Sequence, residues 1–314
     1  MGLARTAPPK QKHPCLLLVD SNNRREPLPN GDAMYQMTND FVEANGIKLH
    51  YFRTGRVDRP TVILLHGVTD SGKCWSSVAA ELADVYDVVM PDARGHGRSD
   101  APELGYGEED RAADVAGLIR ALRLDRPVLL GHSMGAATAI STAALFPDLV
   151  RAVILEDPPW PGRSYGSTAE EREARAQQWR EDIDRMQRKS IGELIAEQRQ
   201  QYPHWSDDEL NPWAEAKQQV SANIASMMLA PRRRWSDYLR QAGCPLLLIV
   251  GDVERGAIVS PATINEAKMF WQNGRAYHIP DAGHNIHRDQ FQLYMKVVRA
   301  YLREVLRKEL STPG

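Results

Sequence analysis

A chain of 314 residues can bury a large core and can hold one elaborated domain or two. Its hydrophobic share of 42%, charged share of 25% and net charge of −2 are ordinary, so we expect neither nucleic acid nor a membrane surface as a partner. The 3 cysteines are too few and scattered for a disulfide framework, and they fit a reducing, cytoplasmic location. No apolar run approaches the roughly 18 residues that span a bilayer.

Residues 1–37 have the composition of a flexible arm. Prolines interrupt any regular element there: Pro8, Pro9, Pro14, Pro27 and Pro29. The apolar run at residues 15–19 is shorter than the roughly 7–15 residues at the centre of a secretory signal peptide. We therefore expect this segment to lie as a flexible arm on the body of the protein.

Strand and helix patterns then alternate along the chain. Two runs at 41–44 and 47–53 are joined by Asn45-Gly46, which is typical of a tight hairpin turn. Continuous apolar runs, typical of strands buried on both faces, occupy residues 61–66, 85–90, 127–130, 152–155 and 245–250. Helical spacing occupies residues 74–82, 110–122, 136–145, 261–270 and 290–308, with a further strand at 275–279. This alternation predicts an α/β fold with a doubly wound, mostly parallel sheet, built from residues 38–157 and 242–310.

Residues 158–241 interrupt this alternation. No clear buried strand lies there, charged helical sequence dominates, and 5 of the 7 tryptophans fall within it. We expect an inserted helical segment that covers one edge of the sheet. Trp160, which follows Pro158-Pro159 at the start of this insertion, is a candidate to line an apolar pocket and equally a candidate packing residue.

The sequence Gly131-His132-Ser133-Met134-Gly135 lies between a predicted strand and a predicted helix. The turn through Gly-x-Ser-x-Gly is so sharp that the residues two before and two after the serine must lack side chains. Ser133 is then held in a strained conformation with its hydroxyl beyond the sheet edge. The N-terminus of the following helix directs its N–H groups toward any anion that forms there.

Two further motifs lie on either side of this turn in the sequence. A strand ends at His66-Gly67 upstream, and Gly283-His284 follows the last predicted strand. A serine hydroxyl needs an adjacent base to become a nucleophile, and His284 in such a loop would lie over the same sheet edge. We therefore expect Ser133 as nucleophile and His284 as base. His278, His284 and His287 do not indicate a metal site, because no carboxylate spacing supports one.

Together with Asp92-x-Arg94-Gly95-x-Gly97-x-Ser99, these motifs make residues 39–308 resemble the capped α/β-hydrolases of the cofactor-independent esterase, lactonase and haloperoxidase-like group. The resemblance implies an eight-stranded, mostly parallel sheet with a helical cap at 158–241. It also implies an oxyanion hole formed by the backbone N–H groups of Val68 and Met134. Neither a metal nor another cofactor is expected.

The acid that orients His284 remains open at this point. Asp252 lies directly after the strand at 245–250 and is the commoner residue type for the role. Counted from Pro245, the position usual in the resembling group falls on Glu254. Some members place the acid after the strand that follows the helix predicted at residues 136–145, where Glu156 and Asp157 lie.

The function implied is hydrolysis of a small-molecule carboxylic ester or lactone through an acyl-enzyme. Cleavage of an amide, carbamate or carbon–carbon bond is an alternative, because the same serine chemistry serves those substrates. A non-catalytic small-molecule receptor on the same fold is a second alternative. The sequence carries no indication of the substrate itself or of the oligomeric state.

Overall fold

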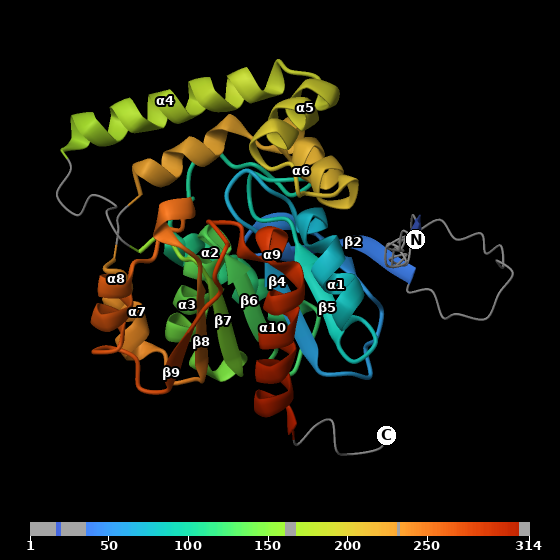
Figure 1. Ribbon diagram of the computed structural model, residues 1–314, viewed down its shortest axis with the longest axis vertical. Coiled ribbons are helices and arrows are strands. Elements are labelled where there is room, and N and C mark those ends of the chain that lie inside the picture. The colour runs from blue at the N-terminus through green and yellow to red at the C-terminus, as the bar shows by residue number, and fades with distance from the viewer. Residues whose placement is uncertain (1–16, 20–35, 161–167, 231–232, 308–314) are drawn as a thin grey trace, which may run out of the picture.

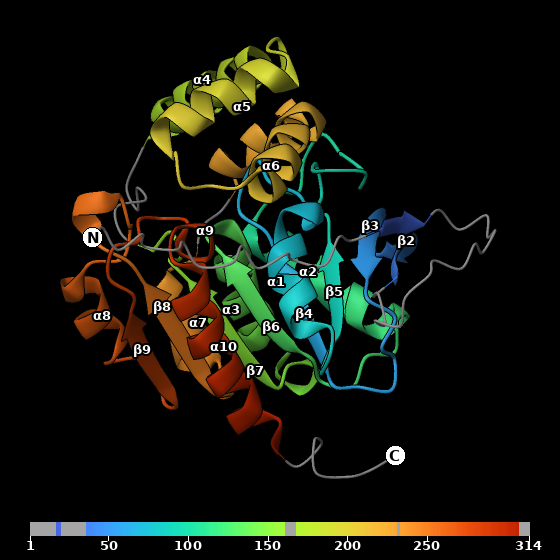
Figure 2. The same ribbon diagram turned by 45° about the vertical axis from the view of Figure 1, so that its right-hand side comes forward.

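The computed structural model describes residues 17–19, 36–160, 168–230 and 233–307, which form a sheet with helices on both faces and above one edge (Figures 1 and 2). The strands are β1 (Leu17–Val19), β2 (Gln36–Ala44), β3 (Ile47–Arg53), β4 (Thr61–Leu65), β5 (Asp87–Pro91), β6 (Val128–His132), β7 (Ala152–Glu156), β8 (Leu246–Val250) and β9 (Gly274–His278). Their order in the sheet is β1-β2-β3-β5-β4-β6-β7-β8-β9.

All strand pairs are parallel except β2 with β3 and β3 with β5. Strands β2 to β9 form the predicted doubly wound, mostly parallel sheet, so the predicted fold class is confirmed. Strand β1 adds an edge strand to it, with Leu18 opposite Met37. This strand lies within the segment predicted as a flexible arm; residues 1–16 and 20–35 of that segment lie outside the described residues.

The helices are α1 (Ser76–Leu82), α2 (Glu108–Ala121), α3 (Met134–Leu145), α4 (Ala169–Gln187), α5 (Ile191–Gln201), α6 (Asp207–Gln219), α7 (Trp235–Gln241), α8 (Pro261–Ala267), α9 (Ile286–Asp289) and α10 (Phe291–Val305). Short 3₁₀ helices are η1 (Gly72–Trp75), η2 (Pro147–Leu149), η3 (Ala222–Met228) and η4 (Val253–Arg255). No helix among the described residues is both long and apolar enough to cross a bilayer.

Two hydrophobic cores lie on opposite faces of the sheet, because successive side chains of a strand point to opposite faces. Val62 and Leu64 of β4 belong to one core, together with residues of α1 and α10. Ile63 and Leu65 belong to the other, together with residues of α2 and α3. Every residue of β4 to β8 is therefore buried, as their continuous apolar sequences predict.

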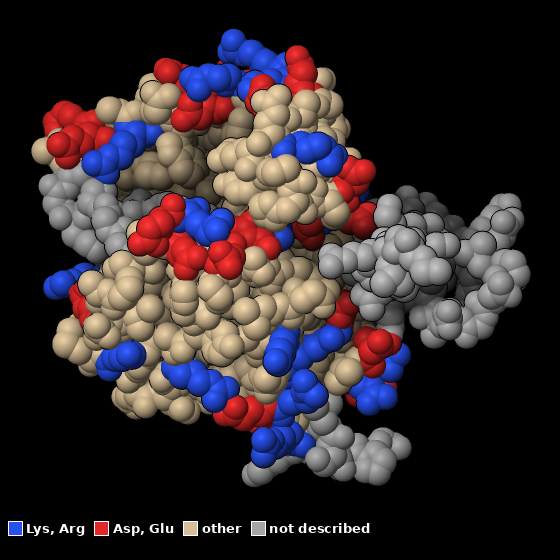
Figure 3. Space-filling view, viewed as in Figure 1, with Lys and Arg blue, Asp and Glu red and all other residues tan. Residues whose placement is uncertain are grey.

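Helices α4, α5 and α6 lie together above the sheet (Figures 1 and 2). They come from the predicted insertion, and exposed ion pairs such as Arg188 with Asp184 cover their outer surface. Helix α7 comes from the same insertion but packs against α3, beside the sheet. On the face shown in Figure 3, basic and acidic side chains are interspersed both on the upper helices and on the body below.

Candidate active site

Ser133 occupies a sharp turn between β6 and α3. Its φ of +52° and ψ of −114° are unusual for a residue with a side chain. A Cβ atom added to Gly131 would lie 2.2 Å from the carbonyl oxygen of Gly135, and one added to Gly135 would lie 2.0 Å from the oxygen of Leu65. Only glycine fits at both positions, so the two glycines permit the strained turn that presents Ser133 at the sheet edge.

His284 lies in the loop between β9 and α9, and its Nδ1 is 2.6 Å from Oδ2 of Asp157. Asp157 follows β7 directly and is fully buried. Its two oxygens also accept the backbone N–H groups of Ile258 at 2.8 Å and Val259 at 2.9 Å. Since the carboxylate is held from several sides, the proton of the imidazole is fixed on Nδ1, and Nε2 is left as the basic nitrogen.

The predictions that Asp252 or Glu254 is the partner of His284 are wrong. Asp252 instead accepts hydrogen bonds from Nε2 of His278 at 2.7 Å and from the N–H of Asp281 at 2.8 Å, and Glu254 is exposed. The hydrogen bond from Asp281 lowers the pKa of Asp252 below its usual value. The sheet order explains the result. Strand β7 is the direct neighbour of β6, which leads to the nucleophile, whereas Asp252 at the end of β8 extends toward β9.

His132 connects the turn at Ser133 to the loop of His284. Its Nε2–H donates to the carbonyl oxygen of His284 at 2.9 Å, and the two rings lie 4.6 Å apart between centroids. Burial lowers the pKa of His132 to about 3, so its ring is neutral at physiological pH. His132, the residue before Ser133, thus holds the backbone at His284 in place.

A second acid–histidine pair lies beside the first. Glu156, the last residue of β7, accepts the backbone N–H of His287 at 3.0 Å and its Nδ1–H at 2.8 Å. Burial opposes ionisation of Glu156. The charge and hydrogen bonds of His287 outweigh that effect and lower the pKa of Glu156 to about 2. Glu156 was one of the open alternatives for the acid. In the structure its carboxylate bonds to His287 and anchors α9, whereas His284 bonds to Asp157.

The loop after β4 provides the first predicted oxyanion donor, Val68. The Nδ1–H of His66 donates to the carbonyl oxygen of Gly67 at 2.7 Å, while its Nε2 accepts the N–H of Ala93 at 2.9 Å. Burial lowers the pKa of His66, which keeps it neutral for this double role. The second predicted donor, Met134, is the first residue of α3, where a backbone N–H has no partner within the helix.

A cavity of about 50 Å³ brings four of the predicted site residues together. Its lining includes Val68, Ser133, Met134 and Trp160. Trp160 is 3% exposed and stacks on Trp235 with ring centroids 5.0 Å apart. Trp160 therefore satisfies both interpretations made from the sequence, because it packs against a neighbouring helix and also lines the cavity.

Arg111 of α2 lines the same cavity and was not anticipated from the sequence. It is buried, with its Nε donating to Oγ1 of Thr138 at 3.2 Å and its Nη1 donating to the carbonyl oxygen of Tyr106. A signal was present, since Arg111 shares a helical face with Val115 and Leu118 at spacings of four and seven residues. A charged residue on an inward-facing helical stripe is itself an indication of a polar interior site.

Comparison with known proteins identifies the family of the chain. The chain matches the family described as the alpha/beta hydrolase family over residues 62–295. It is 29% identical over 254 residues to 2-(acetamidomethylene)succinate hydrolase of Mesorhizobium japonicum, covering 77% of this chain and 88% of that protein. It is 32% identical over 251 residues to N-formylmaleamate deformylase of Pseudomonas putida, covering 78% and 89%.

Solved structures show the same similarity. The crystal structure of E-2-(acetamidomethylene)succinate hydrolase superposes with a TM-score of 0.69 at 26% identity, covering 85% of this chain and 99% of that chain. A thermophilic esterase from Thermogutta terrifontis superposes with a TM-score of 0.66, also at 26% identity, with the same coverage of 85% and 99%. From the sharp turn at Ser133, the sheet order and these matches, the chain belongs to the alpha/beta hydrolase family.

Proposed function

We propose that this protein is a serine hydrolase that cleaves a small ester, lactone or amide through an acyl-enzyme, with Ser133, His284 and Asp157 as its catalytic triad. The observation that carries the proposal is the 2.6 Å contact between Nδ1 of His284 and Asp157, in a loop tied to the residue before Ser133. This contact supports a base with its Nε2 free to accept a proton. A receptor would not need that arrangement.

The reaction would run in two steps. The Oγ of Ser133 attacks the substrate carbonyl while its proton passes to Nε2 of His284, and the N–H groups of Val68 and Met134 stabilise the oxyanion. When the carbonyl re-forms, the leaving oxygen or nitrogen takes the proton from Nε2. Water then gives a proton to His284, attacks the acyl-enzyme and releases the acid product, with Oγ of Ser133 reprotonated by His284. The carboxylate of Asp157 stabilises the imidazolium.

The two named relatives favour an acylated nitrogen as the bond that is cleaved. The names 2-(acetamidomethylene)succinate hydrolase and N-formylmaleamate deformylase both describe an N-acyl substrate that also carries at least one carboxylate. Arg111 supports a substrate carboxylate here, because its buried guanidinium, which already donates to Thr138, lines the cavity together with Ser133. Guanidinium recognises carboxylates, although Glu108 adds a carboxylate to the same lining. The esterase similarity keeps ester cleavage as the second candidate.

A set of four chromogenic substrates would test these points together. Butyryl and succinyl chains of equal length would each be joined to p-nitrophenol and to p-nitroaniline. We expect the succinyl compounds to have the higher kcat/KM, by about 10-fold or more for one buried ionic contact. Comparing the anilide with the phenyl ester then shows whether the enzyme cleaves a bond to nitrogen or to oxygen. Preference for the butyryl compounds would contradict the role of Arg111.

Covalent labelling by a fluorophosphonate probe would test the mechanism independently of the substrate. We expect the wild-type chain to be labelled, Ser133→Ala to be unlabelled and Ser141→Ala to be labelled as the wild type is. Ser141 is a matched control, because it is a buried serine on α3 whose hydroxyl donates to the carbonyl oxygen of Thr138. An unlabelled wild-type chain would contradict the proposed function.

A further inference from the structure

Four buried charged residues lie together between α6, α9 and the loop after β4. We refer to Asp70, Glu209, Lys217 and Arg288 as the Asp70 cluster, and each of these residues is at most 8% exposed. They come from three segments that lie more than 70 residues apart in the sequence: the loop after β4, helix α6, which carries both Glu209 and Lys217, and helix α9. None of them has a role in the proposed reaction.

Asp70 closes the turn that carries the predicted oxyanion donor Val68. Its backbone N–H donates to the carbonyl oxygen of Gly67 at 3.2 Å, and between them Thr69 has a φ of +64°, a strained value for a β-branched residue. Nζ of Lys217, on α6, donates to the carbonyl oxygen of Thr69 at 3.0 Å and to Oδ1 of Asp70 at 2.7 Å. One ammonium group therefore holds both residues that follow Val68.

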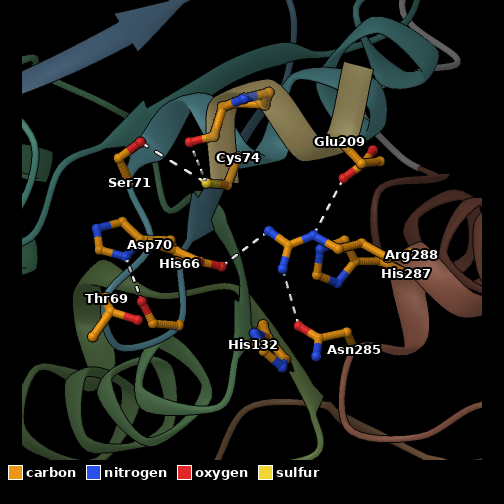
Figure 4. Close-up of polar contacts among 12 residues, drawn as sticks. His66, Thr69, Asp70, Ser71, Cys74, His132, Glu209, Asn285, His287 and Arg288 are labelled. Carbon is orange, nitrogen blue, oxygen red and sulfur yellow. Dashed lines mark hydrogen bonds and ion pairs between the residues drawn. The ribbon is translucent and has the colours of Figure 1, made fainter. Parts of the chain in front are cut away.

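Arg288 connects the same carboxylate to the loop of the base. It lies on α9, four residues after His284, and donates to Oδ2 of Asp70 at 3.0 Å and to Oδ1 of Asn285 at 3.0 Å. Its Nε donates to Oε2 of Glu209, on α6, at 3.2 Å. Figure 4 shows Arg288 between these three partners. The single carboxylate of Asp70 thus joins the oxyanion loop, the base loop and the helices above the sheet.

The charges in this cluster depend strongly on one another. Burial opposes ionisation of Asp70, but Lys217 and Arg288 prevail and hold the pKa of Asp70 far below its usual range. Burial likewise opposes the charge of Arg288, and Asp70 prevails and raises its pKa. Removing one member would leave an uncompensated charge in a buried site, so the remaining members would move toward water or a new partner. The turn at Val68 and the start of α9 would move with them.

We propose that Asp70, Lys217 and Arg288 are positioning residues that align the N–H of Val68 with His284 only when α6 is seated over the site. This inference rests on the proposed function for its catalytic consequence. Its structural part, that one contact on α6 orders two loops at the sheet edge, stands apart from that function. Loss of Lys217 should then impair stabilisation of the oxyanion more than it impairs binding of the substrate.

The test compares Lys217→Met with Lys73→Met. Lys73 is a matched control, because its Nζ also joins the body to α6, through Oε2 of Glu215 at 2.7 Å, but it does not contact the turn after Val68. With the best of the four substrates, we expect kcat of Lys217→Met to fall about 10- to 100-fold, a partial loss of an oxyanion donor. KM should change less than about threefold. For Lys73→Met, both constants should stay within about twofold of the wild type.

Native-state hydrogen exchange provides the readout that does not need catalysis. We expect faster exchange at residues 67–70 and 284–288 in Lys217→Met, although the substitution lies on α6, and wild-type exchange there in Lys73→Met. If Lys217→Met does not fold, Asp70→Asn combined with Lys217→Met, which removes one charge of each sign, serves in its place with the same expected results.

Each result supports or overturns one part of the proposal. Unchanged exchange in both loops, or equal effects of the two lysine variants, would overturn the coupling. Altered exchange with unchanged kcat and a raised KM would overturn the positioning role. A wild-type chain that resists the fluorophosphonate probe would contradict the proposed function alone, and the exchange data would still support or overturn the coupling.

Discussion

Two acid–histidine pairs stand side by side at the end of β7, and they differ mainly in how far solvent reaches the histidine. Asp157 pairs with His284, whose side chain is 28% exposed, while Glu156 pairs with His287, whose side chain is 3% exposed. Successive residues at a strand end point to opposite sides of the sheet, so the two carboxylates enter different surroundings. The same chemical pairing can therefore serve a reaction in one place and hold a helix in the other.

The surroundings of the buried pair support this distinction. The ring of His287 packs on Trp75, with centroids 4.5 Å apart, and on the side of α10 it lies 6.0 Å from Tyr294. His287 lines a different cavity from the one that holds Ser133, so its imidazole does not face the nucleophile. His284 lies instead in the loop tied by His132 to the residue before Ser133. Four predictions, from the largest expected effect to the smallest, test whether access separates the roles of these pairs.

The largest effect is expected for Asp157→Asn. An asparagine would donate to Nδ1 of His284 or leave it unpaired, so that the ring would hold its proton on the wrong nitrogen. We expect kcat to fall about 10⁴-fold, with KM nearly unchanged. Steady-state kinetics on the best substrate would measure this, and a decrease of less than about tenfold would contradict the assignment of the acid.

Glu156→Gln should affect stability and leave most of the catalysis intact. The variant removes a buried carboxylate from His287 and weakens the anchor of α9, which we expect to lower the free energy of unfolding by about 2 kcal/mol. Urea unfolding followed by tryptophan fluorescence would measure it. If kcat of Glu156→Gln fell as far as that of Asp157→Asn, the two pairs would share one role and the comparison would fail.

The buried neutral histidines around the site should make folding stability depend on pH, an effect smaller than the two above. Burial lowers the pKa of His66, and it lowers the pKa values of His96 and His132 to about 3 each, below an unfolded value of about 6.5. The folded state therefore binds fewer protons than the unfolded state at acidic pH. Their contribution to stability is complete above about pH 6.5 and is lost as pH falls toward about 3.

Measuring the free energy of unfolding against pH would check this sign. We expect stability to fall between about pH 6.5 and 4, and the slope for His96→Gln to be smaller by up to about one proton. A smaller slope of unfolding free energy against pH would identify His96 as one of the groups that titrate, even if the substitution also changes the stability itself. A slope equal to that of the wild type would show that His96 is already protonated in the folded state.

The smallest effect is expected for Asp252→Asn. Asp252 and His278 form a third acid–histidine pair, with side chains 24% and 54% exposed, on the outer side of the sheet. Solvent weakens such a contact, so we expect kcat within about twofold of the wild type and an unchanged unfolding midpoint. A large loss of activity would restore Asp252 as a catalytic candidate.

Local sequence determined the parts of the site that depend on backbone geometry. The glycines on either side of Ser133, the His66-Gly67 step and the Gly283-His284 loop each specify a turn within a few residues. Continuous apolar runs likewise determined the strands of a sheet covered on both faces. The sharp turn at Ser133 was predictable because the carbonyl oxygen of Gly135, which excludes a side chain at Gly131, is only four residues away in the chain.

The tertiary structure alone decided which residues meet across the fold. Asp157 pairs with His284 because β7 lies next to β6, and no local pattern distinguished it from Asp252 or Glu254. Arg111 lines the cavity, and the Asp70 cluster forms, only when α2, α6 and α9 take their places. The physical reason is the same in each case, because a buried charge is determined by its partner, and the partner comes from a distant part of the chain.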